Sequence, residues 1–325
     1  MREEKLLEVE NLTIYYITDD AGTCKAVNHV SFSLGKGETL GLVGETGAGK
    51  TTIARGIMGL IPNPPGKIME GKILFRGLDL LKIREKEIRK IRGNDISMIF
   101  QDPMTALNPT DTVGEQIAEV LRYQKKLGKK DARREAVKMM EMVGIPGERY
   151  EEYPHQFSGG MKQRIVIAIA LACKPELLIA DEPTTALDVT IQAQVLDMMK
   201  ELKERLGTSM ILITHDLGVV AEMCDRVAVV YAGEVVEMGR AEHIYDETAH
   251  PYTIGLFGSL PSMAGTENRL KPVEGMMPDP ADLPKGCKFA PRCPNRRKEC
   301  EEQETALREI SEGHFVRCAY CGKER

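Results

Sequence analysis

A glycine-rich stretch near the amino terminus has the spacing of a phosphate-binding loop, G-x-x-x-x-G-K-[S/T]. Its glycines let the backbone curl so that successive N–H groups face inward, and a helix amino terminus adds positive potential. Lys50 can then reach the β- and γ-phosphates of a nucleoside triphosphate, and the Thr51 hydroxyl can ligate Mg²⁺. Alone, the loop predicts only that the chain binds a nucleoside triphosphate. It consists of Gly44, Glu45, Thr46, Gly47, Ala48, Gly49, Lys50 and Thr51.

Two acidic residues follow a short apolar run at 177–180, which has the pattern of a buried strand. At the carboxyl end of a parallel strand, such side chains face the ligand crevice. Asp181 suits the coordination shell of Mg²⁺, which prefers oxygen ligands, and Glu182 can polarise an attacking water as general base. An Asp-Glu pair after an apolar run is common and means little alone. Together with the phosphate loop it predicts hydrolysis of a nucleoside triphosphate.

Strand and helix patterns alternate around both motifs. Such alternation predicts an α/β fold with a mostly parallel sheet and helices on its faces. We expect strands at 6–16, 26–34, 38–43, 73–75, 96–100, 177–180, 210–214, 226–231 and 234–239, and helices at 51–60, 82–92, 158–172 and 191–206.

Two stretches depart from that alternation. Residues 113–143 offer two amphipathic helical patterns separated near Gly128, which predicts a helical insertion. Beyond His250 the chain becomes rich in proline and poor in long apolar runs. A segment of that composition cannot bury much core alone, and small modules of this kind usually need a metal or disulfide staple.

Composition excludes several classes of protein. The chain has 325 residues, 42% of them hydrophobic, and 44 Lys and Arg against 49 Asp and Glu give a net charge of −5. The hydrophobic content excludes intrinsic disorder as the main state, and the acidic balance argues against a dedicated nucleic-acid binder. The longest uncharged apolar stretch, 165–173, is too short to span a bilayer, and the first five residues are mostly charged. We therefore expect no signal segment and a cytosolic chain.

The segment Phe157-Ser158-Gly159-Gly160-Met161-Lys162-Gln163 resembles the signature motif of ATP-binding-cassette (ABC) ATPases. The other motifs of that family follow in order. Gln101 resembles the Q-loop glutamine, residues 185–188 resemble the D-loop, and His215 resembles the switch histidine. The resemblance covers about residues 6–245. It implies a P-loop NTPase core with a mixed or parallel sheet, an antiparallel N-terminal β subdomain and a helical insertion at about 102–172.

The resemblance also assigns roles to residues. It implies that Tyr16 stacks on adenine, with Tyr15 as the less favoured candidate. It also implies that Thr52 contributes to nucleotide binding and that Thr51, Gln101 and Asp181 hold Mg²⁺. Glu182, His215 and Gln101 would be the catalytic residues. By the family pattern, the signature turn serves the ATP of a partner subunit, so that two nucleotides lie between two cassettes. The residues reaching that partner site would be Ser158, Gly159, Gly160 and Asp188.

The tail of the chain, residues 246–325, is similar to that of the oligopeptide and dipeptide importer ATPases. The similarity lies in His250-Pro251-Tyr252-Thr253 and in the segment 286–294. This implies a motor subunit at the cytoplasmic face of the membrane, with two permease chains, an external peptide-binding protein that acts indirectly, and a paralogous ATPase or a second copy as partner. Nickel and other small-solute importers remain alternatives. The alternative outside transport is a soluble ABC protein that switches with nucleotide and engages nucleic acid or ribosomes. The single cassette and the acidic net charge argue against it.

Five of the eight cysteines lie in the last 39 residues, with the spacing C-x₅-C-x₆-C-x₁₇-C followed by Cys321. Tight C-x₂₋₄-C pairs are typical of structural zinc sites, and only Cys318 and Cys321 offer one. The looser spacing and the pair Cys293-Pro294 favour a [4Fe-4S] cluster, while zinc, free thiols and a labile disulfide stay open. The predicted ligands are Cys287, Cys293, Cys300 and Cys318. We expect a cassette over residues 1–245 and a Cys-rich extension over 246–325.

Overall fold

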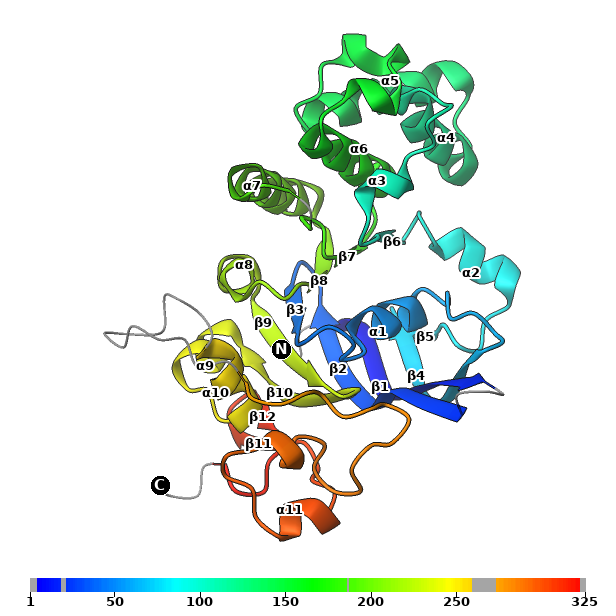
Figure 1. The fold of residues 1–325 in the computed structure, drawn as a ribbon. Helices are drawn as coiled ribbons and strands as arrows, with labels where there is room; N and C mark the ends of the chain where they lie inside the picture. The colour runs from blue at the N-terminus through cyan, green and yellow to red at the C-terminus, as the bar shows by residue number, and fades with distance from the viewer. Residues whose placement is uncertain (1–4, 19–21, 186, 259–272, 322–325) are drawn as a thin grey trace. The chain divides into compact units, whose positions relative to one another are not determined.

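The computed structural model describes residues 5–18, 22–185, 187–258 and 273–321 (Figure 1). They belong to two compact units. The first unit contains residues 35–39 and 82–212, and the second contains residues 5–34, 40–81 and 213–325. Strands β3 and β8 contribute residues to both units.

The first unit is built on fully buried strands. β6 (Ile96–Ile99) pairs in parallel with β7 (Leu177–Asp181), and every residue of both is buried. β8 (Ser209–Ile213) is buried in the same way. Strands covered on both faces read as continuous apolar runs, which explains why their sequences do not alternate. The long helix α7 (Val189–Leu206) ends at Gly207, which adopts the left-handed conformation.

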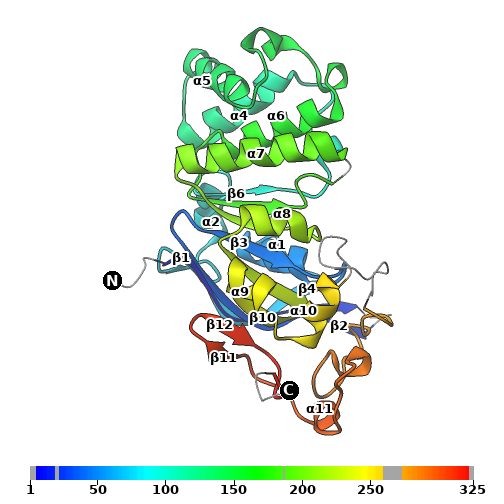
Figure 2. The same ribbon diagram turned by 90° about the vertical axis from the view of Figure 1, so that its left-hand side faces the viewer.

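The predicted helical insertion is confirmed. α4 (Val113–Lys125) and α5 (Lys129–Met142) are separated at Gly128, and they pack with α6 (Gly159–Leu171) in one cluster (Figures 1 and 2). Gly114 has no room for a side chain, since a Cβ there would lie 2.1 Å from the Tyr150 ring. The first unit also contains α2 (Glu85–Ile91), α3 (Pro103–Ala106), and the 3₁₀ turns η1 (Gly147–Glu151) and η2 (Pro154–Gln156).

The second unit contains an antiparallel sheet with the strand order β2-β1-β4-β5. β1 (Lys5–Thr18) pairs with β4 (Gly66–Phe75), which is longer than the predicted strand at 73–75. Glycines and charged residues in the first half of β4 hide its strand pattern. The antiparallel N-terminal subdomain is thus present. Its other strands are β2 (Gly22–Gly35) and β5 (Leu78–Asp79), and α1 (Lys50–Ile57) packs against β1 through Gly56.

The same unit holds a second group of strands in the order β11-β12-β10-β9-β3. β3 (Thr39–Val43) is parallel to β9 (Arg226–Tyr231), and β9 forms a hairpin with β10 (Glu234–Arg240). Two strands of the tail continue this group, because β12 (His314–Val316) pairs with β10 and β11 (Arg308–Ser311) pairs with β12 (Figure 1). The remaining elements are α8 (Leu217–Met223), α9 (Ala241–Asp246), α10 (Pro251–Phe257), η3 (Ala290–Arg292) and α11 (Glu299–Glu302).

A buried carboxylate fixes this attachment of the tail. Glu237 of β10 is completely buried and accepts hydrogen bonds from the backbone N–H groups of Ala249 and His250, at 2.8 and 3.0 Å. Nε2 of His314, on β12, lies 2.9 Å from the same carboxylate. Burying a carboxylate costs free energy unless its oxygens are satisfied. Glu237 therefore joins β10, the start of α10 and β12.

Replacing Glu237 by Ala should loosen the tail. Two backbone N–H groups and a buried ring would lose their acceptor, so we expect the free energy of unfolding to fall by about 3 kcal/mol. Urea unfolding measures that loss, and limited trypsin digestion should release tail fragments sooner. Glu312→Ala, at an exposed position in the turn between β11 and β12, is the matched control. Equal stability of the two variants would contradict the anchoring role of Glu237.

Candidate active site

The phosphate loop lies in the second unit between the fully buried β3 and the first turn of α1. Gly44 and Gly49 have φ values of 149° and 104°. A Cβ at Gly44 would lie 2.1 Å from the carbonyl oxygen of Val230, and one at Gly49 would lie 2.4 Å from that of Ala26. Only glycine fits at these two positions, so the sequence spacing reflects a close approach of three backbone segments.

The loop presents its apex to solvent. Thr46 and Gly47 are exposed, whereas Gly44 and Ala48 are buried. Lys50 Nζ donates to the carbonyl oxygens of Gly44 and Glu45, at 2.7 and 2.9 Å. Thr51 and Thr52, both half-buried, follow in the first turn of α1. N–H groups at a helix start, beside an ammonium group, form an environment suited to an anion.

Two other predicted residues belong to the second unit. Tyr16 is half-buried on β1, where it pairs with Gly66 of β4. His215 is exposed in the turn between β8 and α8. The next residue, Asp216, caps α8 by accepting from the N–H groups of Gly218 and Val219, at 2.9 and 3.3 Å.

In the first unit, a carboxylate is held by two donors after β7. Asp181 ends the strand and is 2% exposed, and Glu182 follows with a positive φ of 49°. Gln101 Nε2 donates to Glu182 Oε2 at 3.0 Å, and Thr185 Oγ1 donates to the same oxygen at 2.9 Å. The structure thus brings Gln101 and Glu182 together. The sequence does not predict the contact between Thr185 and Glu182, because the motif identifies the threonine but not the direction of its hydroxyl.

The predicted signature turn lies at the start of α6, also in the first unit. Ser158 caps this helix and accepts from the N–H of Met161 at 3.4 Å. A Cβ at Gly160 would lie 2.5 Å from Cγ2 of Ile191 on α7. Asp188 caps α7 and accepts from the N–H of Ile191 at 3.0 Å, while Ala186 of the predicted D-loop lies outside the described residues. The starts of α6 and α7 are therefore in close contact.

The predicted Mg²⁺ ligands supply suitable donor atoms. Thr51, Gln101 and Asp181 offer a hydroxyl, an amide oxygen and a carboxylate, which are the hard oxygen ligands that Mg²⁺ prefers. Thr51 belongs to the second unit, and the other two belong to the first. In the described part of the chain, no three His, Cys, Asp or Glu side chains form a group that could hold a metal ion.

The cysteines of the tail gather around one cavity of about 750 Å³. Burial raises the pKa of Cys287 to about 11, and the thiols of Cys300 and Cys318 add to that rise. A hydrogen bond with the Cys321 thiol lowers the pKa of Cys318 to about 6. No disulfide joins any of the eight cysteines, all of which are described. The cavity is lined by Cys287, Cys293, Cys300, Cys318 and Cys321.

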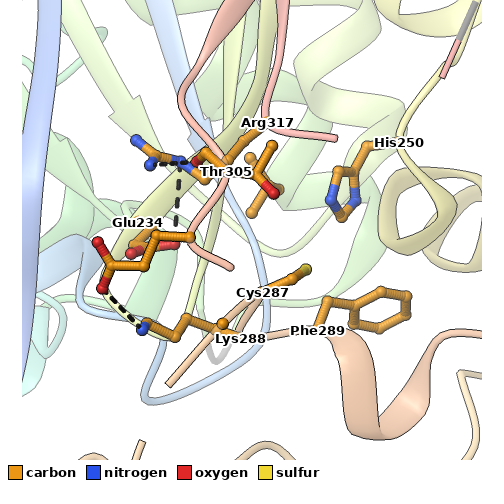
Figure 3. A pocket seen from close by; sticks show the side chains of 10 residues that line it. Glu234, His250, Cys287, Lys288, Phe289, Thr305 and Arg317 are labelled. Atoms are coloured by element: carbon orange, nitrogen blue, oxygen red, sulfur yellow. Dashed lines mark hydrogen bonds and ion pairs between the residues drawn. The ribbon is translucent and has the colours of Figure 1, made fainter. Parts of the chain in front are cut away.

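A second, smaller pocket shares His250, Cys287 and Phe289 with this cavity and is also lined by charged side chains (Figure 3). Arg317 donates through Nη1 to the carbonyl of Thr305 at 3.0 Å (Figure 3). Its Nε donates to the carbonyl of Val235 at 2.9 Å. Glu234 lies 3.8 Å from the same guanidinium. Burial raises the pKa of Glu234, and Arg317 opposes that rise. The segment that carries Cys318 is therefore fastened to β10.

Two family models match the chain. One, described as ABC transporter, matches residues 27–185, and the other, described as oligopeptide/dipeptide transporter, C-terminal region, matches residues 236–300. The dipeptide transport ATP-binding protein DppD of Bacillus subtilis is 54% identical over 97% of this chain and 94% of its own length. The DppD protein of Escherichia coli is 45% identical over 97% of this chain and 96% of its own.

Solved structures resemble the chain in fold. The dimeric post-hydrolysis state of the ATP-binding cassette MJ0796, bound to ADP and phosphate, matches with a TM-score of 0.65 and 27% identity over 72% of this chain and 98% of that one. cbiO1 from Clostridium perfringens, part of an ABC transporter complex, matches with a TM-score of 0.64 and 28% identity over 75% of this chain and 92% of that one. Among the described residues, no helix is long and apolar enough to cross a membrane.

Proposed function

The chain belongs to the ABC transporter family, among the ATP-binding subunits of its oligopeptide and dipeptide importers, and we propose which residues perform each step of its ATPase cycle. Similarity to dipeptide and oligopeptide transport subunits extends over nearly the whole chain, tail included. The observation that carries the hydrolytic role is the fixed Glu182 carboxylate, held by Gln101 and Thr185. The proposed cassette spans residues 1–245 with a helical subdomain at about 102–172, and the extension spans 246–325.

The phosphate loop binds the nucleotide. N–H groups from Gly44 to Thr51, with those at the start of α1, surround the β- and γ-phosphates, and Lys50 exchanges its carbonyl contacts for phosphate oxygens. Thr52 adds a further contact from the first turn, and Tyr16 stacks on adenine. Thr51, Gln101 and Asp181 would hold Mg²⁺, which would supply positive charge to offset the charge that develops on the phosphates.

Glu182 is the general base for the attacking water. The hydrogen bonds from Gln101 and Thr185 both reach its Oε2, so the carboxylate is oriented before ATP arrives. His215 contacts the γ-phosphate from its exposed turn after β8. Gln101 precedes the helical insertion in the chain, and it thus links the state of the nucleotide to whatever chain docks on those helices.

A second cassette completes the active unit. The N–H groups and hydroxyl of exposed Ser158 and Gly159, with half-buried Gly160, form a second anion site that serves the ATP of the partner. Asp188, at the start of α7, also reaches that partner site. The partner is a paralogous ATPase or a second copy of this chain. Two permease chains form the channel, and an external binding protein supplies peptide. We propose that the chain is a peripheral subunit at the cytoplasmic face of the membrane.

Glu182→Gln should bind ATP and hydrolyse it very slowly. Loss of the general base predicts a rate at least about 100-fold lower, because a positioned base contributes about that much or more. Since ATP then persists between the cassettes, the closed dimer should accumulate. Phosphate release and gel filtration in MgATP measure both effects.

Glu201→Gln, an exposed carboxylate on α7, is the matched control for this variant and should hydrolyse ATP normally. Near-normal turnover by Glu182→Gln would remove Glu182 from the role of base.

We further propose that the cysteine cavity binds a [4Fe-4S] cluster through Cys287, Cys293, Cys300 and Cys318. The support for this proposal is that four thiols line one cavity and that a cluster of this type takes four thiolates. As placed, the described side chains form no metal-holding group, so the thiols would have to draw together around the cluster. A bound cluster would cross-link the tail, a role that suits a segment with little core of its own. Cys321 lines the same cavity and is the spare thiol; zinc bound by the same cysteines is the alternative.

Anaerobically purified protein should contain about four iron and four acid-labile sulfide per chain. Cys293→Ser should lose both, whereas Cys321→Ser should keep them. Elemental analysis and the visible absorption spectrum make the measurement. Zinc without sulfide would replace the cluster by a zinc site, and absence of iron, sulfide and zinc would leave the cavity a set of free thiols.

A further inference from the structure

We propose that Arg292, in the tail, is a positioning residue for ATP binding, because it neutralises Glu45 of the phosphate loop and holds that loop in the conformation that binds phosphate. This inference rests on the ATP site proposed above. It adds a residue outside the cassette motifs to the nucleotide site. Arg292 ends the turn η3 and precedes the predicted ligand Cys293.

In this contact the arginine is nearly buried, whereas 31% of the Glu45 side chain is exposed. Arg292 Nη1 donates to both carboxylate oxygens of Glu45, each at 3.0 Å, and only 5% of the arginine side chain is exposed. The other guanidinium nitrogens are also engaged: Nε donates to the carbonyl of Glu274 at 2.9 Å and Nη2 to that of Val273 at 3.2 Å. A guanidinium held at all three nitrogens has little freedom, so the Glu45 carboxylate is held as well.

Further contacts from beyond the cassette motifs reach the same loop. The backbone N–H of Glu45 donates to the hydroxyl of Tyr252, a completely buried side chain of α10, at 3.0 Å. A Cβ at Gly47 would lie 3.2 Å from Cε of Met277. Beside the loop, the N–H of Lys25 donates to the carbonyl of Pro280 at 2.8 Å. Residues 273–280 therefore run along the rim of the phosphate loop.

Charge explains why this arrangement matters for a triphosphate. Glu45 is the second residue of the loop and carries a negative charge beside the position where phosphates bind. Without a paired cation, that carboxylate would repel the ligand at short range. Arg292 removes this repulsion. Because the two side chains are already ordered in the folded chain, less conformational entropy is lost when the nucleotide binds. Activation of the attacking water is assigned to Glu182 and not to Arg292 or Glu45, so we expect the effect on affinity for ATP and not on the chemical step.

Binding of Mg·AMP-PNP to the full-length chain tests this inference, with ATP hydrolysis measured in parallel. Arg292→Ala should weaken binding and raise KM by about tenfold, with kcat within about twofold, as one uncompensated charge near the phosphates predicts. Arg292→Lys keeps the charge but loses the hydrogen bonds to the carbonyls of Glu274 and Val273, so its affinity should lie between those of the parent chain and Arg292→Ala. Arg296→Ala, which removes an exposed arginine paired with Glu301 in the same tail, is the control and should bind normally.

The double variant Glu45→Gln with Arg292→Ala decides between charge compensation and mere anchoring of the tail. If Arg292 acts by neutralising Glu45, removal of both charges restores affinity to within about threefold of the parent chain. Unchanged affinity in Arg292→Ala, or no recovery in the double variant, would overturn the inference. Failure of the parent chain to bind Mg·AMP-PNP would instead overturn the ATP site itself. Iron content and thermal unfolding of each variant show whether the tail is intact.

Discussion

Backbone N–H groups can surround a chain of phosphates only where no side chain stands in the way. That constraint shapes the second unit. Gly44 lies against the carbonyl of Val230 on β9, and Gly49 lies against that of Ala26 on β2. The phosphate loop is thus supported by strands from both strand groups of this unit, and neither glycine tolerates a Cβ. Lys50 donates to two loop carbonyls, contacts that we propose it exchanges for phosphate oxygens.

The same loop also connects the cassette to the tail. Composition suggests that the residues beyond His250 form an extension with little core, yet they supply β11 and β12 to the β10 edge, and Arg292 reaches Glu45. Glu237 holds the strands in place, and the cysteine cavity lies within this attached region. Burial and charge in the tail therefore bear directly on the conformation of the nucleotide site.

Local patterns predicted most of the fold, and long-range contacts account for the rest. The phosphate loop, the buried strand before Asp181 and the two helices around Gly128 each leave a signal within a few residues. The strands β11 and β12, of four and three residues, are too short to show an alternation. Glu45 and Arg292 are 247 residues apart, so nothing in either local sequence indicates their pairing. Thr185 likewise reaches Glu182 only through the shape of its turn.

Transport in a reconstituted system tests the central claim most directly, namely that ATP hydrolysis by this chain drives peptide import. The measurement is accumulation of a labelled dipeptide by vesicles that contain the permease pair, the partner ATPase and the external binding protein. The account predicts accumulation that requires MgATP and is lost when this subunit carries Lys50→Ala. Accumulation that proceeds equally with Lys50→Ala, or MgATP hydrolysis that never moves peptide, would contradict it.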